Sequence, residues 1–68
     1  MTLSGGEVAK ALRKAGFEDV SQRGSHLKLR HADGRTVIVP MHRTLARGTL
    51  ASILRQAQVD ADRLRTLL

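Results

Sequence analysis

Gly24, Ser25 and His26 are the residues of this chain whose types and order could support chemistry. Glycine and serine allow a tight turn with exposed polar backbone groups, and histidine carries the side chain whose ordinary pKa lies nearest to neutral pH. Lys28 and Arg30 follow at alternate positions, which an extended strand would place on the same side as His26. A titratable imidazole beside two cations suits a polyanion, so this segment predicts contact with RNA and, through the histidine, RNA cleavage.

Cleavage of RNA without a metal requires the neighbouring 2′-hydroxyl to attack the phosphorus, while a base takes its proton and a cation holds the phosphate. Neutral His26 is the candidate base. Lys28 would lie about 6.6 Å further along an ideal strand and could hold that phosphate, whereas Arg30, at twice that distance, would hold the next one. The alternative is a solvated strand face in which none of the three has a catalytic task. Further contacts could come from the residues that precede the histidine, namely Arg23, Gly24 and Ser25.

A second candidate RNA-binding position is the start of the helix expected near Gly48 and Thr49, where free N–H groups would attract a phosphate. An ordinary helix cap is the simpler interpretation of these two residues. We interpret His31 and His42 as bystanders, the alternative for His42 being a proton donor to the leaving oxygen. Because the three histidines lack the close pairing of many zinc sites and the chain has no cysteine, we expect no metal and no cofactor.

The composition agrees with an anionic partner. Lys and Arg number 12 against 6 Asp and Glu, and nine of the twelve cations are arginine, whose planar guanidinium suits phosphate. Phe17 is the only Phe, Tyr or Trp, which argues against a protein that stacks successive bases on aromatic rings. The alternative is a soluble domain whose surface is cationic without any role in binding an anion.

The length of 68 residues fits a single domain, residues 1–68. The absence of cysteine excludes disulfides and thiol catalysis. No apolar run approaches the ~20 residues of a membrane span, and the N-terminus lacks the basic-then-apolar order of a signal peptide. We therefore expect a cytoplasmic protein with no membrane partner.

The elements that must hold these residues begin with a helix. Ser4 is a suitable N-cap, and Glu7 three residues later completes a capping box. Apolar residues then recur at helical spacing until Gly16, which suits the left-handed conformation that ends a helix. Gly5 and Gly6 in the first turn each cost up to about 1 kcal/mol relative to alanine, so we expect that end to fray.

Three strands should follow. The first is expected over Phe17–Arg23, and the second over His26–His31, where apolar and polar residues alternate. A three-residue loop with Gly34 in the left-handed conformation would pair Leu29 with Val37 in the third strand. A two-residue loop would shift the register by one residue and turn Ile38 inward instead. We favour the three-residue loop. The third strand ends at the proline that follows, because proline cannot donate to a sheet ladder.

Two more helices are expected, the second being short and capped by Asp60. The order predicts an α+β two-layer sandwich: a three-stranded antiparallel sheet with helices on one face (α-β-β-β-α) and a short C-terminal helix. The other sheet face would be bare and would carry His26, Lys28 and Arg30. The short helix carries Leu64, Leu67 and Leu68. The residues expected to point inward are Val8, Leu12, Phe17, Leu27, Leu29, Val37, Val39, Leu50, Ile53 and Leu54.

Five motifs occur in order along the chain: Lys-Ala-Gly-Phe at 14–17, Gly-Ser-His at 24–26, Val-Pro-Met-His at 39–42, Leu-Ala-Arg-Gly-Thr-Leu at 45–50 and Ile-Leu-Arg-Gln-Ala at 53–57. Together they resemble the HicA family of toxins over nearly the whole chain. The resemblance implies a fold similar to the double-stranded RNA-binding domain and an mRNA interferase that a HicB antitoxin neutralises. It also implies that His26 is catalytic. Two residues depart from the family pattern: Gln58 replaces a usual glycine, and Leu27 replaces a common second histidine.

Three functions fit the sequence. The first is the toxin of a type II toxin–antitoxin system, a metal-independent mRNA endoribonuclease that uses a single histidine as general base. The second is a non-catalytic module that reads double-stranded RNA by shape, although such modules span ~16 base pairs and this chain is small. The third is a protein-interaction domain whose bare sheet face, with Ile38 outward, docks an acidic partner. We favour the first and expect mRNA and a HicB-like antitoxin as partners.

Overall fold

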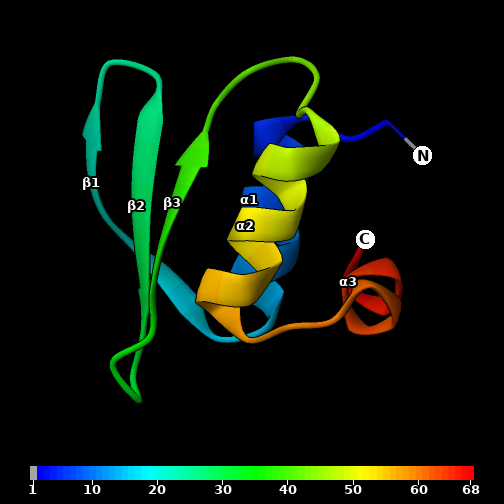
Figure 1. The fold of residues 1–68 in the computed structure, drawn as a ribbon. Helices are drawn as coiled ribbons and strands as arrows, with labels where there is room; N and C mark the ends of the chain where they lie inside the picture. The colour runs from blue at the N-terminus through cyan, green and yellow to red at the C-terminus, as the bar shows by residue number, and fades with distance from the viewer. Residues whose placement is uncertain (1) are drawn as a thin grey trace.

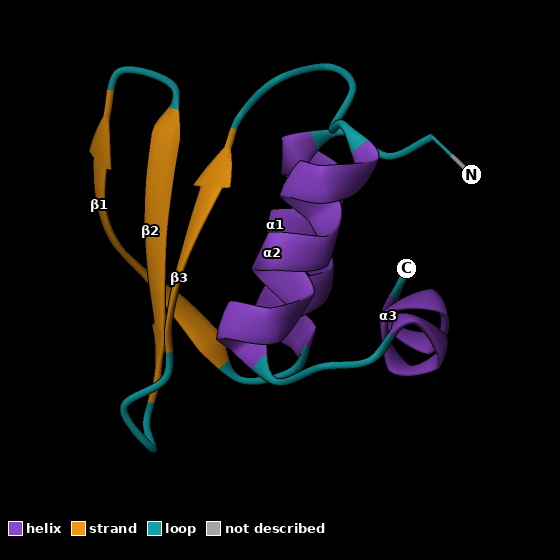
Figure 2. Ribbon diagram, viewed as in Figure 1, coloured by secondary structure: helices purple, strands orange, loops and turns teal. Residues whose placement is uncertain are grey.

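The structure is a computed structural model that describes residues 2–68. The strands lie side by side with β2 in the centre of the antiparallel sheet, α1 and α2 lie on one face, and α3 lies beyond these helices (Figure 1, Figure 2). This arrangement confirms the expected α+β fold. The elements are α1 (Gly5–Lys14), β1 (Phe17–Arg23), β2 (His26–His31), β3 (Thr36–Pro40), α2 (Arg47–Ala57) and α3 (Ala61–Leu67).

The pairing of β2 with β3 confirms the three-residue loop. Leu29 lies opposite Val37, and Gly34 adopts a φ of 99°, the left-handed conformation that the loop requires. Ile38 lies on the opposite face of the sheet, where 40% of its surface is exposed. The register therefore turns the apolar residues of both strands toward the helices and leaves the polar residues of β2 on the other side.

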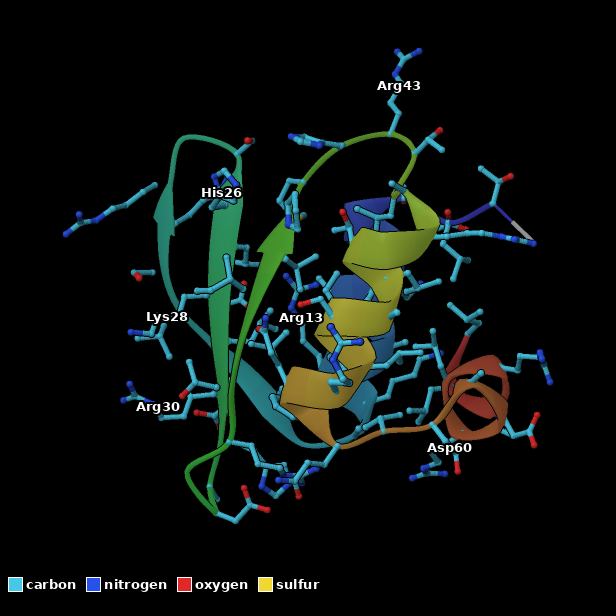
Figure 3. The ribbon with its side chains drawn as sticks, in the orientation of Figure 1. Arg13, His26, Lys28, Arg30, Arg43 and Asp60 are labelled. Atoms are coloured by element: carbon cyan, nitrogen blue, oxygen red, sulfur yellow. The ribbon has the colours of Figure 1, made fainter. Side chains whose placement is uncertain are left out.

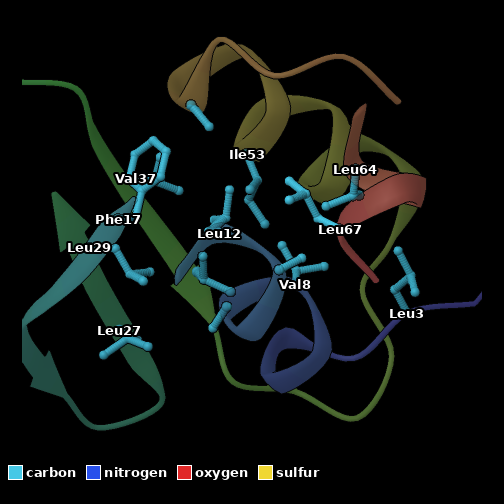
Figure 4. Close-up of a cluster of buried hydrophobic side chains, with 14 of the residues drawn as sticks. Leu3, Val8, Leu12, Phe17, Leu27, Leu29, Val37, Ile53, Leu64 and Leu67 are labelled. Carbon is cyan, nitrogen blue, oxygen red and sulfur yellow. The ribbon is translucent and has the colours of Figure 1, made fainter. Parts of the chain in front are cut away.

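Apolar side chains from both layers meet between the sheet and the helices (Figure 4). Leu50 and Leu54, expected in this core, are only half-buried. The reason is that α2 packs against the edge strand β3, so part of its apolar face lies at the margin of the core. Leu64 and Leu67 are buried through the contact of α3 with α1, whereas Leu68 is 45% exposed. The remaining inward residues are buried as predicted: Val8, Leu12, Phe17, Leu27, Leu29, Val37, Val39 and Ile53.

The start of α1 is capped as predicted but does not fray as expected. The Ser4 hydroxyl accepts a hydrogen bond from the Glu7 N–H at 3.0 Å, and the Glu7 carboxylate accepts one from the Ser4 N–H at 2.9 Å. Gly5 is buried, and its N–H donates to the carbonyl of His42 at 2.8 Å. A Cβ on Gly5 would come within 2.0 Å of the Pro40 carbonyl oxygen, so only glycine permits this close approach.

Both ends of α2 differ from a simple capped helix. The helix begins at Arg47 with Ala46 in the N-cap position and no side-chain cap hydrogen bond. The interpretation of Gly48 and Thr49 as an ordinary cap is therefore wrong, because both lie inside the first turn. At the other end Gln58 has a φ of 56°, a left-handed conformation that glycine adopts at lower cost.

Candidate active site

The sheet face that the helices leave uncovered, which we call the open face, carries His26 and its predicted neighbours (Figure 3). A hollow on this face is lined by His26, Lys28 and Arg23, together with Ser21 and Ile38. The structure therefore brings together three of the predicted site residues. The His26 ring is exposed, and within residues 2–68 its side chain takes part in no hydrogen bond with the protein.

A β-bulge in β1 places Arg23 beside His26. The register of β1 against β2 shifts between Asp19 and Ser21, so that Val20 is the extra residue. Arg23 consequently lies opposite His26, and directly opposed residues point to the same face of an antiparallel sheet. Without the extra residue the side chain of Arg23 would turn to the helix side, because a slip of one residue exchanges the two faces. The sequence analysis predicted Arg23 as a contact but gave no sign of the bulge.

The loop after β3 brings a second imidazole to the site. The ring centroids of His26 and His42 lie 6.4 Å apart with an angle of 66° between the rings. The His42 Nε2 atom lies 3.4 Å from the hydroxyl of Ser25, and the Met41 N–H donates to the Ser25 carbonyl. His42 was interpreted as a bystander in a basic loop, but the fold places it next to the candidate base.

Arg30 and the start of α2 lie apart from this group. Arg30 borders a different hollow together with Glu18, which is its partner across the sheet, and its Nε lies 3.4 Å from the Thr36 hydroxyl. Gly48 and Thr49 occupy the first turn of α2 and do not line the hollow that contains His26. The hollow thus joins fewer of the predicted contacts than the sequence analysis proposed.

His31, at the far end of β2, has a structural environment. Its ring packs edge-on against Phe17 with centroids 5.2 Å apart, and only 25% of its side chain is exposed. The Asp33 N–H donates to its Nδ1 atom at 3.1 Å. Arg35, which the sequence analysis did not single out, also belongs here: its guanidinium lies over the Phe17 ring and donates to the Ala57 carbonyl at the end of α2.

The charge distribution favours an anion at the His26 end of the sheet. Both helices that cover the sheet begin there, since α1 is bonded to the loop after β3 and α2 follows that loop (Figure 1). Helix N-termini carry a partial positive charge. Two carboxylates are engaged elsewhere: a hydrogen bond from Arg13 lowers the pKa of Asp19, and hydrogen bonds from Arg35 lower the pKa of Asp33.

Residues 2–68 show neither a candidate metal site nor a membrane-spanning helix. Residues 2–68 contain no group of three or more His, Cys, Asp or Glu side chains placed to bind a metal ion. None of the helices within that range is both long and apolar enough to cross a membrane.

The fold and the site define a small α+β domain with a histidine on a basic, uncovered sheet face. A family model described as "HicA toxin of bacterial toxin-antitoxin" matches residues 5–59, which include every element except α3. The chain therefore belongs to the HicA toxin family, as the resemblance of its motifs predicted, and this membership supports a toxin role. No curated protein matches the chain.

Proposed function

We propose that this protein is the toxin of a type II toxin–antitoxin system and acts as a metal-independent mRNA endoribonuclease with His26 as general base. The observation that supports the proposal is the placement of His26: an exposed imidazole with no hydrogen bond to any described residue, in a hollow shared with Arg23 and Lys28. An imidazole held by a carboxylate or packed in a core would be committed to the fold. This one is open to a substrate.

The proposed reaction uses the hydroxyl that RNA carries beside each phosphate. His26 takes the proton of the 2′-hydroxyl, whose oxygen attacks the adjacent phosphorus. The P–O5′ bond breaks as the new P–O2′ bond forms, which leaves a 2′,3′-cyclic phosphate and a 5′-hydroxyl after protonation of the leaving oxygen. Lys28 and Arg23 stabilise the negative charge that develops on the phosphoryl oxygens. Gly24 and Ser25 form the turn that places the base at the start of the central strand β2.

The remaining predicted contacts extend the binding surface. Arg30, further along the open face, would hold a neighbouring phosphate. The free N–H groups of Gly48 and Thr49 lie at an uncapped helix start, where an anion is stabilised, and they would hold a more distant one. The proposed partner of the resting toxin is a HicB-like antitoxin that covers the open face, and the proposed site of action is the cytoplasm.

The test uses the purified chain and a labelled RNA in EDTA. We expect fragments that end in a 2′,3′-cyclic phosphate, and no cleavage at a position where the nucleotide has a 2′-deoxyribose. The matched control is a variant in which His26 is replaced by alanine and whose circular dichroism and melting curve match the wild type. Folded protein that binds RNA and leaves it intact would overturn the proposal in favour of a binding module.

A further inference from the structure

His42 is held beside His26 by contacts from two other parts of the fold. Its carbonyl accepts a hydrogen bond from the buried Gly5 at the start of α1, at 2.8 Å. The preceding residue, Met41, donates its N–H to the carbonyl of Ser25 in the turn before β2. The loop that carries His42 is therefore fixed to the helix on one side and to the turn on the other. The 6.4 Å between the two ring centroids is a consequence of the fold.

We propose that His42 is the general acid of the reaction, the group that donates a proton to the departing 5′-oxygen. This assignment rests on the proposed function, in which His26 takes the proton of the 2′-hydroxyl. In the same step the P–O2′ bond forms, the P–O5′ bond breaks and the proton of His42 passes to O5′. His26 then holds one additional proton and His42 has lost one, and exchange with water restores both residues.

The geometry suits two separate proton transfers. No hydrogen bond joins the two imidazoles within residues 2–68, so neither ring is the other's proton acceptor. Each ring nitrogen needs a reacting oxygen at about 2.6–3.2 Å, and rings 6.4 Å apart leave room for one phosphodiester between them. Both side chains are exposed, so the substrate can reach them.

Ser25 is a positioning residue in this arrangement. Its hydroxyl lies 3.4 Å from Nε2 of His42, slightly longer than a usual hydrogen bond. That contact restrains the ring and leaves Nδ1 as the nitrogen without a hydrogen-bond partner within residues 2–68. Ser25 thus orients His42, the proposed proton donor, while the Gly24–Ser25 turn positions His26, the proposed base.

The experiment compares two RNA substrates that differ in one atom. In the first, the leaving atom at a cut site mapped with the wild-type protein is the natural 5′-oxygen. In the second it is a bridging sulfur, whose thiolate departs without a proton. We expect H42A to cleave the oxygen substrate about 10²–10⁴-fold more slowly than the wild type, and the sulfur substrate within a few-fold of the wild-type rate. H26A should be slow on both, because the 2′-hydroxyl still needs a base.

The outcomes separate the two proposals. If H42A is slowed equally on both substrates, or on neither, His42 is not the acid, and the ribonuclease proposal still stands. If the wild type cleaves neither substrate, the proposed function and this assignment fall together. S25A provides a second variant, which keeps the His42 side chain but removes the contact that restrains its ring: it should be slowed a few-fold on the oxygen substrate and less on the sulfur substrate. Equal slowing of S25A on both would contradict the positioning role.

Discussion

His26 and His31 occupy the two ends of the same strand, β2, and their surroundings differ in every respect that matters for chemistry. The His31 ring is three-quarters covered, packs on Phe17 and accepts a hydrogen bond from the Asp33 N–H. The His26 ring is exposed, has no protein hydrogen bond within residues 2–68, and shares a hollow with cations. The comparison shows that position in the fold, and not residue type, packs one histidine against Phe17 and leaves the other open; the proposed function gives the open one to a substrate.

The two ends of the sheet differ in the same sense. At the His26 end both covering helices begin, and their positive ends face the loop that carries His42. At the His31 end the same helices finish, and Arg35 is engaged by Asp33 and by the Ala57 carbonyl. Within residues 2–68 Arg23 and Lys28 form no ion pair, whereas Arg35 is held by the fold, so we expect an anionic ligand to prefer the His26 end.

The largest expected effect is on the cleavage rate of matched histidine variants. H26A should lower the single-turnover rate about 10²–10⁴-fold, the usual contribution of general base catalysis, with the free energy of unfolding changed by less than about 0.5 kcal/mol. H31A should retain a cleavage rate within a few-fold of the wild type. Both rates are measured in EDTA on the same RNA.

H31A is expected to be less stable than the wild type, so the cleavage assays must be run at a temperature at which H31A is still folded. Loss of the Phe17 contact and of the Asp33 hydrogen bond should cost about 1–2 kcal/mol, or a fall in Tm of about 4–8 °C per kcal/mol. Thermal melting monitored by circular dichroism checks this value and sets a temperature at which all variants are folded. If folded H31A loses as much activity as H26A, the contrast between the two ends of β2 fails.

The next effect concerns the close contact that anchors the His42 loop. G5A should destabilise the protein by about 3 kcal/mol, because the new Cβ would meet backbone atoms of the chain after β3 that cannot move aside cheaply. G48A is the matched control in the first turn of α2. Nothing lies within 4 Å of a Cβ there, and alanine favours a helix by up to about 1 kcal/mol.

Urea unfolding of the two glycine variants measures the difference directly. A G5A chain with the urea midpoint of the wild type would show that the start of α1 is not packed against the loop. It would also remove the reason for regarding the position of His42 as fixed.

A smaller effect is expected on RNA affinity. K28A removes a cation from the hollow, whereas K10A removes one from α1, which covers the other face of the sheet. Both variants lose one positive charge, but only K28A should lose a phosphate contact. It should weaken RNA binding several-fold and reduce the slope of log K against log[salt] by about 0.7, the value for one contact on a single strand. Fluorescence anisotropy titrations over a range of salt test this, and equal losses in the two variants would mean that only net charge matters.

The smallest effect lies at the His31 end. Q58G should stabilise the protein by about 0.5–1 kcal/mol, because glycine adopts the left-handed conformation of this residue at lower cost. The cleavage rate should not change, since Gln58 is not part of the hollow. Chemical denaturation gives the stability, and a change in cleavage rate would show that the two ends of the molecule are coupled.

Much of the open face could be predicted from sequence, because its determinants are local. The alternation of β2 and the turn at Gly24 fix the side on which His26, Lys28 and Arg30 lie, and Gly34 fixes the hairpin register. These signals each depend on a few consecutive residues. The capping of α1 by a serine and a glutamate is local in the same way.

The features that were not predicted depend on contacts between distant segments. The bulge at Val20 and the burial of Gly5 arise from how elements pack, and nothing in their immediate sequence distinguishes them. The position of His42 was accessible in principle: a register that pairs Leu27 with Val39 also pairs His26 with Pro40, which brings the residues after Pro40 to the start of β2. Following the register to the end of the strand would have placed the second imidazole.

The most direct test of the account is chemical rescue of H26A by free imidazole. The single-turnover cleavage rate of H26A is measured in EDTA at increasing imidazole concentration, with a melting curve to show that the variant is folded. We expect almost no cleavage without imidazole and a rate that rises with its concentration, because the added base can take the proton of the 2′-hydroxyl in the space that the side chain leaves. A folded H26A chain that cleaves RNA at the wild-type rate before any imidazole is added would contradict the central claim that the open imidazole of β2 is the base.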